Sequence, residues 1–206
     1  MRKSLTVLAL LAVGLLGAQV AMADTCNGAS AGANLVQNCA FGTGDFTSWS
    51  GTALSDPFNG VDTGDPLAIG STPYNGLTYE AFLGSSSDET LSQTFSTLAG
   101  RKYIVEFALL NDTNPSLGYG NDFTATFGGA TLFSEVNSAA DAYTLYSFTT
   151  SATGSSTTLA FTSSNPSGDF ELDSISVTGT PEPGSFLLLG SGLVALAGAV
   201  RRRFSR

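Results

Sequence analysis

Alternation of apolar and polar residues along short segments is the feature that most constrains the fold of this chain. From Tyr103 to Leu109 every second residue is large and apolar, and shorter stretches of the same kind lie at Phe123–Phe127, Tyr146–Phe148 and Leu159–Phe161. A period of two places one set of side chains on one face of a β-strand, whereas a helix needs a period of about 3.6. The pattern therefore predicts β-strands with one buried face.

Other segments of the central chain also favour strands. We expect them at Asn34–Phe41, Pro66–Gly70, Thr78–Leu83, Glu89–Ser96 and Asp169–Thr178. Turn-forming pairs separate the segments, among them Asn59-Gly60, Asn75-Gly76 and Gly128-Gly129. About nine or ten short strands at this spacing predict an all-β fold, an antiparallel β-sandwich or jelly roll. The 206 residues suffice for one such domain with a sizeable core.

The segment 169–178 breaks its own alternation. Phe170 and Leu172 occupy even-numbered positions, and Ile175 and Val177 occupy odd-numbered ones. In a regular strand the two pairs would therefore point to opposite faces. If all four side chains are buried, the strand must bulge or bend near Asp173-Ser174. The simpler alternative is that only one of the two pairs faces the core.

Composition excludes several classes of function. The chain contains no His, which removes the commonest general base and zinc ligand, and with them Ser-His-Asp and Cys-His catalysis. Its formal charge is −9, and an acidic chain lacks the basic face that nucleic acids need. Residues 24–180 hold sixteen acidic residues against only two basic ones, Arg101 and Lys102. We expect no nucleic-acid partner, but neutral polysaccharide, cations or other proteins.

The first 23 residues have the organisation of a secretory signal peptide. Two basic residues precede an uncharged apolar helix-forming run, Leu5–Leu16. Ala21 and Ala23 supply the small residues required for cleavage before Asp24. The pattern predicts a removable signal helix and an exported protein; the alternative is an N-terminal membrane anchor.

The C-terminal segment, residues 180–206, has three parts in a fixed order. It begins with Pro181-Glu182-Pro183, continues with the uncharged apolar stretch Ser185–Val200, and ends with a basic cluster that includes Arg201, Arg202 and Arg203. The apolar stretch is slightly shorter than the about 20 residues of a typical membrane-spanning helix. The basic cluster is expected to stop on the cytoplasmic side of the inner membrane.

These three parts together resemble the PEP-CTERM sorting signal, which is carried by substrates of exosortase, a membrane enzyme of Gram-negative bacteria. The resemblance implies that exosortase recognises Pro181-Glu182-Pro183 and cleaves near it. It also implies transient anchoring in the inner membrane, followed by delivery to the cell surface or outside the cell. The body, residues 24–179, is then the working domain. The alternative is a plain tail anchor with a Pro-rich hinge.

Two parts of the body resemble galactose-binding-like jelly rolls, a fold that includes carbohydrate-binding modules. Asn34-Leu35-Val36, continuing to Phe41 and Trp49, resembles the first strand and turn, and Leu172–Val177 resembles the last strand. The resemblance implies a structural calcium between these strands. Asp173 matches a ligand of the last strand. Gly42 stands where the family has an acidic residue, so Asp45 or main-chain carbonyls are the expected substitutes. The alternative is that Asp173 binds no calcium and is solvated or accepts backbone N–H groups. No other cofactor is expected.

Cys26 and Cys39 are the only cysteines. In an exported protein they are expected to form a disulfide, closing a loop of about 14 residues and stabilising the fold by roughly 3 kcal/mol. The alternative is two free thiols.

The candidate aromatic platforms for a sugar are Trp49, Tyr74, Tyr79, Tyr119 and Tyr143. Tyr74 and Tyr119 are the better candidates because they lie in loops rich in Gly, Pro and Asn, whereas Trp49 matches a residue that is usually packed in the jelly-roll family. The alternative is that these loop tyrosines cover the ends of the sandwich. Asp169, Glu171 and Asp173 share one strand face and could in principle serve a glycosidase. We favour an acidic, solvent-exposed face that discourages edge pairing.

The sequence patterns predict a non-enzymatic exported protein, and the resemblance to PEP-CTERM proteins implies a place at the cell surface or in the extracellular matrix, in association with exopolysaccharide in a biofilm. The alternative is a carbohydrate-binding module that recognises a neutral polysaccharide.

Overall fold

The computed structural model describes residues 34–63, 73–74, 77–118, 120–180 and 191–192. In these residues nine β-strands form two antiparallel sheets, with 3-10 turns at Thr52–Ser55 and Pro115–Leu117. The predicted all-β sandwich is therefore confirmed. The predicted terminal helices lie outside the described residues except for Ser191-Gly192, which is helical. Within the described part of the chain, no helix is long and apolar enough to cross a membrane.

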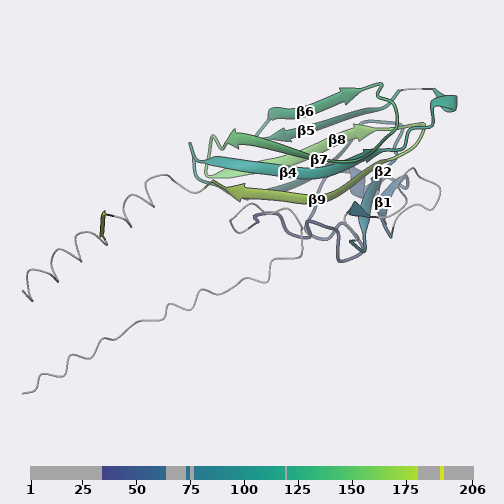
Figure 1. Cartoon of the computed structure of the whole chain (residues 1–206). Helices are drawn as coiled ribbons and strands as arrows, with labels where there is room; N and C mark the ends of the chain where they lie inside the picture. The colour runs from purple at the N-terminus through teal and green to yellow at the C-terminus, as the bar shows by residue number, and fades with distance from the viewer. Residues whose placement is uncertain (1–33, 64–72, 75–76, 119, 181–190, 193–206) are drawn as a thin grey trace, which may run out of the picture.

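The two sheets lie face to face as two layers (Figure 1). The five-stranded sheet has the order β1 (Asn59–Asp62), β2 (Glu80–Leu83), β9 (Phe170–Gly179), β4 (Lys102–Asn111) and β7 (Asp141–Ser151). The four-stranded sheet has the order β3 (Glu89–Ser96), β8 (Ser156–Ser164), β5 (Asp122–Phe127) and β6 (Ala130–Val136).

Aromatic side chains fill the space between the layers. Phe107 of β4 lies at the centre, with its ring centroid 5.3 Å from that of Phe161 on β8 and 6.2 Å from that of Phe123 on β5. All three side chains are fully buried. The alternating residues Tyr103–Leu109 point into this core, as their period of two predicts. Their neighbours on β4 therefore point to the outer face of the five-stranded sheet.

The segment Asn34–Phe41 is not a strand, and that prediction is wrong. Asn38 and Phe41 have φ angles of 49° and 50°, which interrupt an extended chain. The segment instead joins the two sheets. The Leu35 N–H donates to the Val177 carbonyl of β9 at 2.9 Å, and the Gln37 N–H donates to Oε1 of Gln93 on β3 at 2.8 Å.

Two further differences concern β1 and β6. Asn59-Gly60, predicted as a turn, lies inside β1, where Gly60 pairs with Phe82. A Cβ at Gly60 would come within 2.5 Å of the Phe82 ring, so this position needs glycine for close packing. The strand β6 was not predicted. The expected strand Pro66–Gly70 and turn Asn75-Gly76 lie outside the described residues.

The predicted bulge in the last strand is confirmed. Phe170, Leu172, Ile175 and Val177 are all fully buried, which excludes the alternative of one buried pair. The register between β4 and β9 shifts between Glu106 and Ala108, and Ser174 has a φ of 49°. The extra residue reverses the parity of β9, so that both apolar pairs face the core.

Candidate functional site

The outer face of the five-stranded sheet carries buried acidic side chains. Glu80 on β2, Glu106 on β4, and Glu171 and Asp173 on β9 are all buried, although they point away from the core between the sheets. Glu171 is 2 % exposed and Asp173 is 0 % exposed. The expectation that the acidic face of the last strand is solvated is therefore wrong.

Two tyrosines lie beside these carboxylates. The hydroxyl of Tyr143 on β7 donates a hydrogen bond to Oε2 of Glu80 on β2 at 2.5 Å. Strands β4 and β9 lie between β7 and β2, so this hydrogen bond spans both of them. The Tyr74 ring lies 5.6 Å from the Tyr143 ring, centroid to centroid. The Tyr74 N–H donates to Oδ2 of Asp173 at 3.2 Å, which fixes this loop residue on the sheet. Both rings are only partly buried.

On this face, burial favours the neutral, protonated forms of the tyrosine hydroxyl and of the buried carboxyl groups. Burial, together with the charge of Glu80, raises the pKa of the Tyr143 hydroxyl, so this group remains a hydrogen-bond donor. Burial raises the pKa of Asp173 to about 8, although the N–H groups of Ser174 and Tyr74 favour its charged form.

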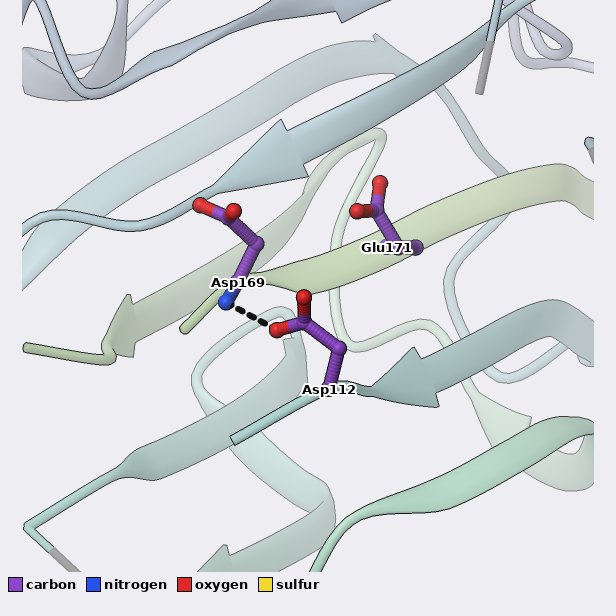
Figure 2. Close-up of side chains that lie close together, drawn as sticks. All are labelled: Asp112, Asp169 and Glu171. Atoms are coloured by element: carbon purple, nitrogen blue, oxygen red, sulfur yellow. Dashed lines mark hydrogen bonds between the residues drawn. The ribbon is translucent and has the colours of Figure 1, made fainter. Parts of the chain in front are cut away.

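A second cluster of carboxylates lies where β4 ends and β9 begins (Figure 2). Asp112 follows β4, Asp169 precedes β9, and Glu171 lies within β9; one oxygen from each lies within 4.8 Å of the others. The Asp169 N–H donates to Oδ1 of Asp112 (Figure 2). Burial, followed by the charges of Glu80 and three aspartates, raises the pKa of Glu171 to about 10. These three residues could hold a metal ion.

The predicted calcium ligands Asp45 and Asp173 lie in different surroundings. Asp45 is exposed, and hydrogen bonds from the hydroxyl of Thr43 at 2.7 Å and the N–H of Thr47 at 2.9 Å lower its pKa. Asp173 is buried under Tyr74. The calcium expected between the two carboxylates stays a prediction.

Several predicted residues lie outside the described part of the chain: Ala21, Ala23, Asp24, Cys26, Tyr119, Pro181, Glu182, Pro183, Arg201, Arg202 and Arg203. Cys39, the expected partner of Cys26, is buried and disulfide-bonded. Trp49 is packed in the core against Phe41, with ring centroids 5.7 Å apart, and is not a surface platform.

Sequence reasoning named Tyr74 and Tyr143 as possible sugar platforms but did not single out Glu80 or Asp112. Glu80 lies on β2 and Asp112 follows β4, and only the order of strands in the sheet brings them to the last strand. No local motif marks them.

The C-terminal segment has a match among protein families. Residues 180–203 match the PEP-CTERM protein-sorting motif. The chain carries this sorting signal. This match confirms the resemblance inferred from Pro181-Glu182-Pro183, the apolar stretch and the basic cluster. The motif indicates an exported protein. No curated protein matches the sequence.

Solved structures resemble the body. The carbohydrate-binding module TmCBM61, in complex with β-1,4-galactotriose, has a TM-score of 0.52 and 15 % identity, over 71 % of this chain and 99 % of that chain. A cleaved adhesin domain of Lys-gingipain from Porphyromonas gingivalis has a TM-score of 0.51 and 12 % identity. The alignment covers 69 % of this chain and 96 % of the adhesin domain. The enzymatically active domain of tailspike protein 4 from bacteriophage CBA120 has a TM-score of 0.50 and 12 % identity. The alignment covers 71 % of this chain and 21 % of the tailspike chain.

At these identities the likeness shows the fold alone. It confirms the predicted resemblance to galactose-binding-like jelly rolls of the carbohydrate-binding-module type. The same architecture hosts unrelated activities, so function has to be argued from the surface of this chain.

Proposed function

We propose that this protein is processed at its C-terminus by exosortase and delivered to the cell surface or extracellular matrix, where its jelly roll binds a neutral exopolysaccharide. The match of residues 180–203 to the PEP-CTERM sorting motif carries the first part of the proposal. An export signal joined to a jelly roll of the carbohydrate-binding type supports the second part.

The tyrosine pair on the outer sheet face favours sugar binding. Aromatic rings pack against the C–H faces of sugars, and Tyr74 and Tyr143 offer two partly exposed rings in contact. The Glu80 carboxylate, itself buried, accepts the hydroxyl hydrogen bond of Tyr143 and so fixes the position of this ring. The body as a whole is strongly acidic, with sixteen acidic residues against two basic ones in residues 24–180, and it repels anionic glycans, which is why the proposed ligand is neutral.

The same face is suited to binding without cleavage. A glycosidase needs two carboxyl groups about 5–10 Å apart that both reach the glycosidic bond. Glu171 and Asp173 are almost completely buried, so a sugar chain on the surface does not reach them. We therefore propose a non-catalytic role for the body.

Mass spectrometry of the protein recovered outside producing cells tests the processing step. We expect a form that lacks the tail beyond Pro181-Glu182-Pro183, and replacement of these three residues by Ala should leave the tail attached. A strain without exosortase provides the control for cleavage by other proteases. Recovery of an extracellular protein that still carries Arg201–Arg206 would contradict the proposal.

A glycan array probed with the full chain in detergent tests the binding step. We expect retention on neutral polysaccharides, including the galactan type bound by TmCBM61, and none on polyuronates. Retention on acidic glycans alone, or on none at all, would overturn the binding role while leaving the sorting role intact.

A further inference from the structure

We propose that Asp112, Asp169 and Glu171 form a calcium site where β4 ends and β9 begins (Figure 2). This site is separate from the tyrosine pair, and it is independent of the proposed sugar binding. It also differs from the expected calcium site at Asp45 and Asp173, neither of which belongs to this group.

The spacing of the oxygen atoms suits calcium. Calcium binds oxygen ligands at about 2.3–2.6 Å, so two ligands on opposite sides of the ion lie about 4.6–5.2 Å apart. One oxygen from each of the three carboxylates lies within 4.8 Å of the other two. Magnesium, at about 2.0–2.1 Å, requires a smaller and more regular octahedron. The upper limit of 4.8 Å is compatible with calcium, and three carboxylates suit calcium better than magnesium, which usually keeps several waters and takes one or two carboxylates.

Glu171 gives independent reason to expect a cation. Its side chain is 2 % exposed, and its Oε2 atom has no hydrogen-bond partner in the described structure. Its register partners on the neighbouring strands are the apolar residues Phe82 and Leu110. A buried carboxylate without a partner is costly, and such groups are normally paired or bind a metal.

The body has no basic side chain near Glu171 that could pair with its carboxylate. Arg101 and Lys102 are its only cations, and they lie at the start of β4. Asp112 lies just beyond the other end of that ten-residue strand, about 30 Å away at the usual rise per residue. Asp62 and Glu80 add further negative charge around Glu171. Within the body, the negative charge of Glu171 can therefore be neutralised only by protonation or by a bound cation.

Two glycines leave room for the carboxylates. A Cβ at Gly84 would lie 1.9 Å from Oδ1 of Asp169, and a Cβ at Gly168 would lie 2.5 Å from Oδ1 of Asp112. Any other residue would push these oxygen atoms out of their positions. The Gly168 carbonyl lies 3.2 Å from the same Gly84 Cβ position and is a further oxygen of the kind that calcium accepts.

Calorimetric titration of the chelator-stripped full chain with CaCl₂ tests the site. We expect one ion per chain with a Kd of about 1 mM or tighter, the range of extracellular calcium modules. Glu171→Gln, which keeps the shape and removes the charge, should weaken binding at least tenfold. Asp88→Asn, which changes an exposed carboxylate outside both the group and the expected Asp45–Asp173 site, is the matched control and should leave calcium affinity unchanged. Asp45→Asn distinguishes the two sites, and the affinity of the Asp112–Asp169–Glu171 group should be unchanged in this variant.

Thermal unfolding separates loss of the site from loss of the fold. In chelator, Glu171→Gln should melt no lower than the wild type, since Gln keeps the shape of the buried side chain and brings no charge into the site. Calcium should raise the melting temperature of the wild type and not that of the variant. The proposal is overturned by the absence of heat and of a melting shift at about 10 mM calcium, well above the expected Kd. It is equally overturned if Asp45→Asn loses as much affinity as Glu171→Gln, or if magnesium binds as tightly as calcium.

Discussion

At the scale of single residues, Asn38 organises the loop that follows the N-terminal segment. Its side-chain N–H groups donate to the carbonyls of Asp45 at 2.9 Å and Thr47 at 3.0 Å, and its Oδ1 accepts from the Thr43 N–H at 3.3 Å. Its own carbonyl accepts from the indole N–H of Trp49 at 3.2 Å. Its left-handed backbone, which Asn tolerates well, turns the chain toward these partners.

Asn38→Ala should therefore lower the free energy of unfolding by about 2 kcal/mol, because it leaves carbonyls of the loop without their donors and places Ala at a positive φ. Urea unfolding of the full chain in detergent measures the effect. Asn114→Ala is the control: its exposed side chain accepts one local hydrogen bond, from Ser116, and its loss should cost about 0.5 kcal/mol. Equal losses for the two variants would contradict the role assigned to Asn38.

At the scale of elements, the last strand shows what local sequence can predict. The parity change between Leu172 and Ile175 lies within a few residues, so the bulge could be inferred before its partner strands were known. The same is true of the alternation in β4. By contrast, Asn59-Gly60 is a turn by local preference, and only the packing of Phe82 across Gly60 makes it part of a strand.

Local sequence likewise predicts only part of the candidate site. That Glu171 and Asp173 share one face follows from their spacing on one strand. Their burial does not, because it depends on neighbouring strands and on Tyr74, a loop residue whose N–H donates to Asp173. Asp112 joins Asp169 only through the pairing of β4 with β9. Contacts made within one element are encoded locally, whereas contacts between elements depend on strand order.

The bulge itself leads to a prediction at Ser174. This residue has a φ of 49°, and its buried Oγ has no hydrogen-bond partner in the described structure. Ser174→Gly should raise the free energy of unfolding by about 0.5–1 kcal/mol, because Gly adopts a positive φ without strain and removes a buried polar group. Ser174→Val should lower it by more than 1 kcal/mol, since β-branched residues resist this backbone conformation. Urea unfolding with the opposite order of stability would show that the bulge is not strained here.

At the scale of the whole molecule, charge and topology divide the protein into parts with separate tasks. Six of its eight basic residues belong to the two terminal segments, and the body between them is strongly acidic. The PEP-CTERM motif accounts for the C-terminal cluster. In the body, the space between the sheets is filled by aromatic residues, and the outer face of the five-stranded sheet holds buried carboxylates and the tyrosine pair.

This division predicts that the body, and not its termini, binds polysaccharide, through the face that carries Tyr74. The most direct test is calorimetric titration of the full chain with the neutral polysaccharide that the glycan array selects. Tyr74→Ala should weaken binding about tenfold, equivalent to about 1.4 kcal/mol, by removing one of the two stacking rings. The control Tyr79→Phe, which keeps its ring packed beside Gly44, should bind as the wild type does. Unchanged affinity in Tyr74→Ala, or no binding of the wild type to any neutral polysaccharide, would contradict the central claim.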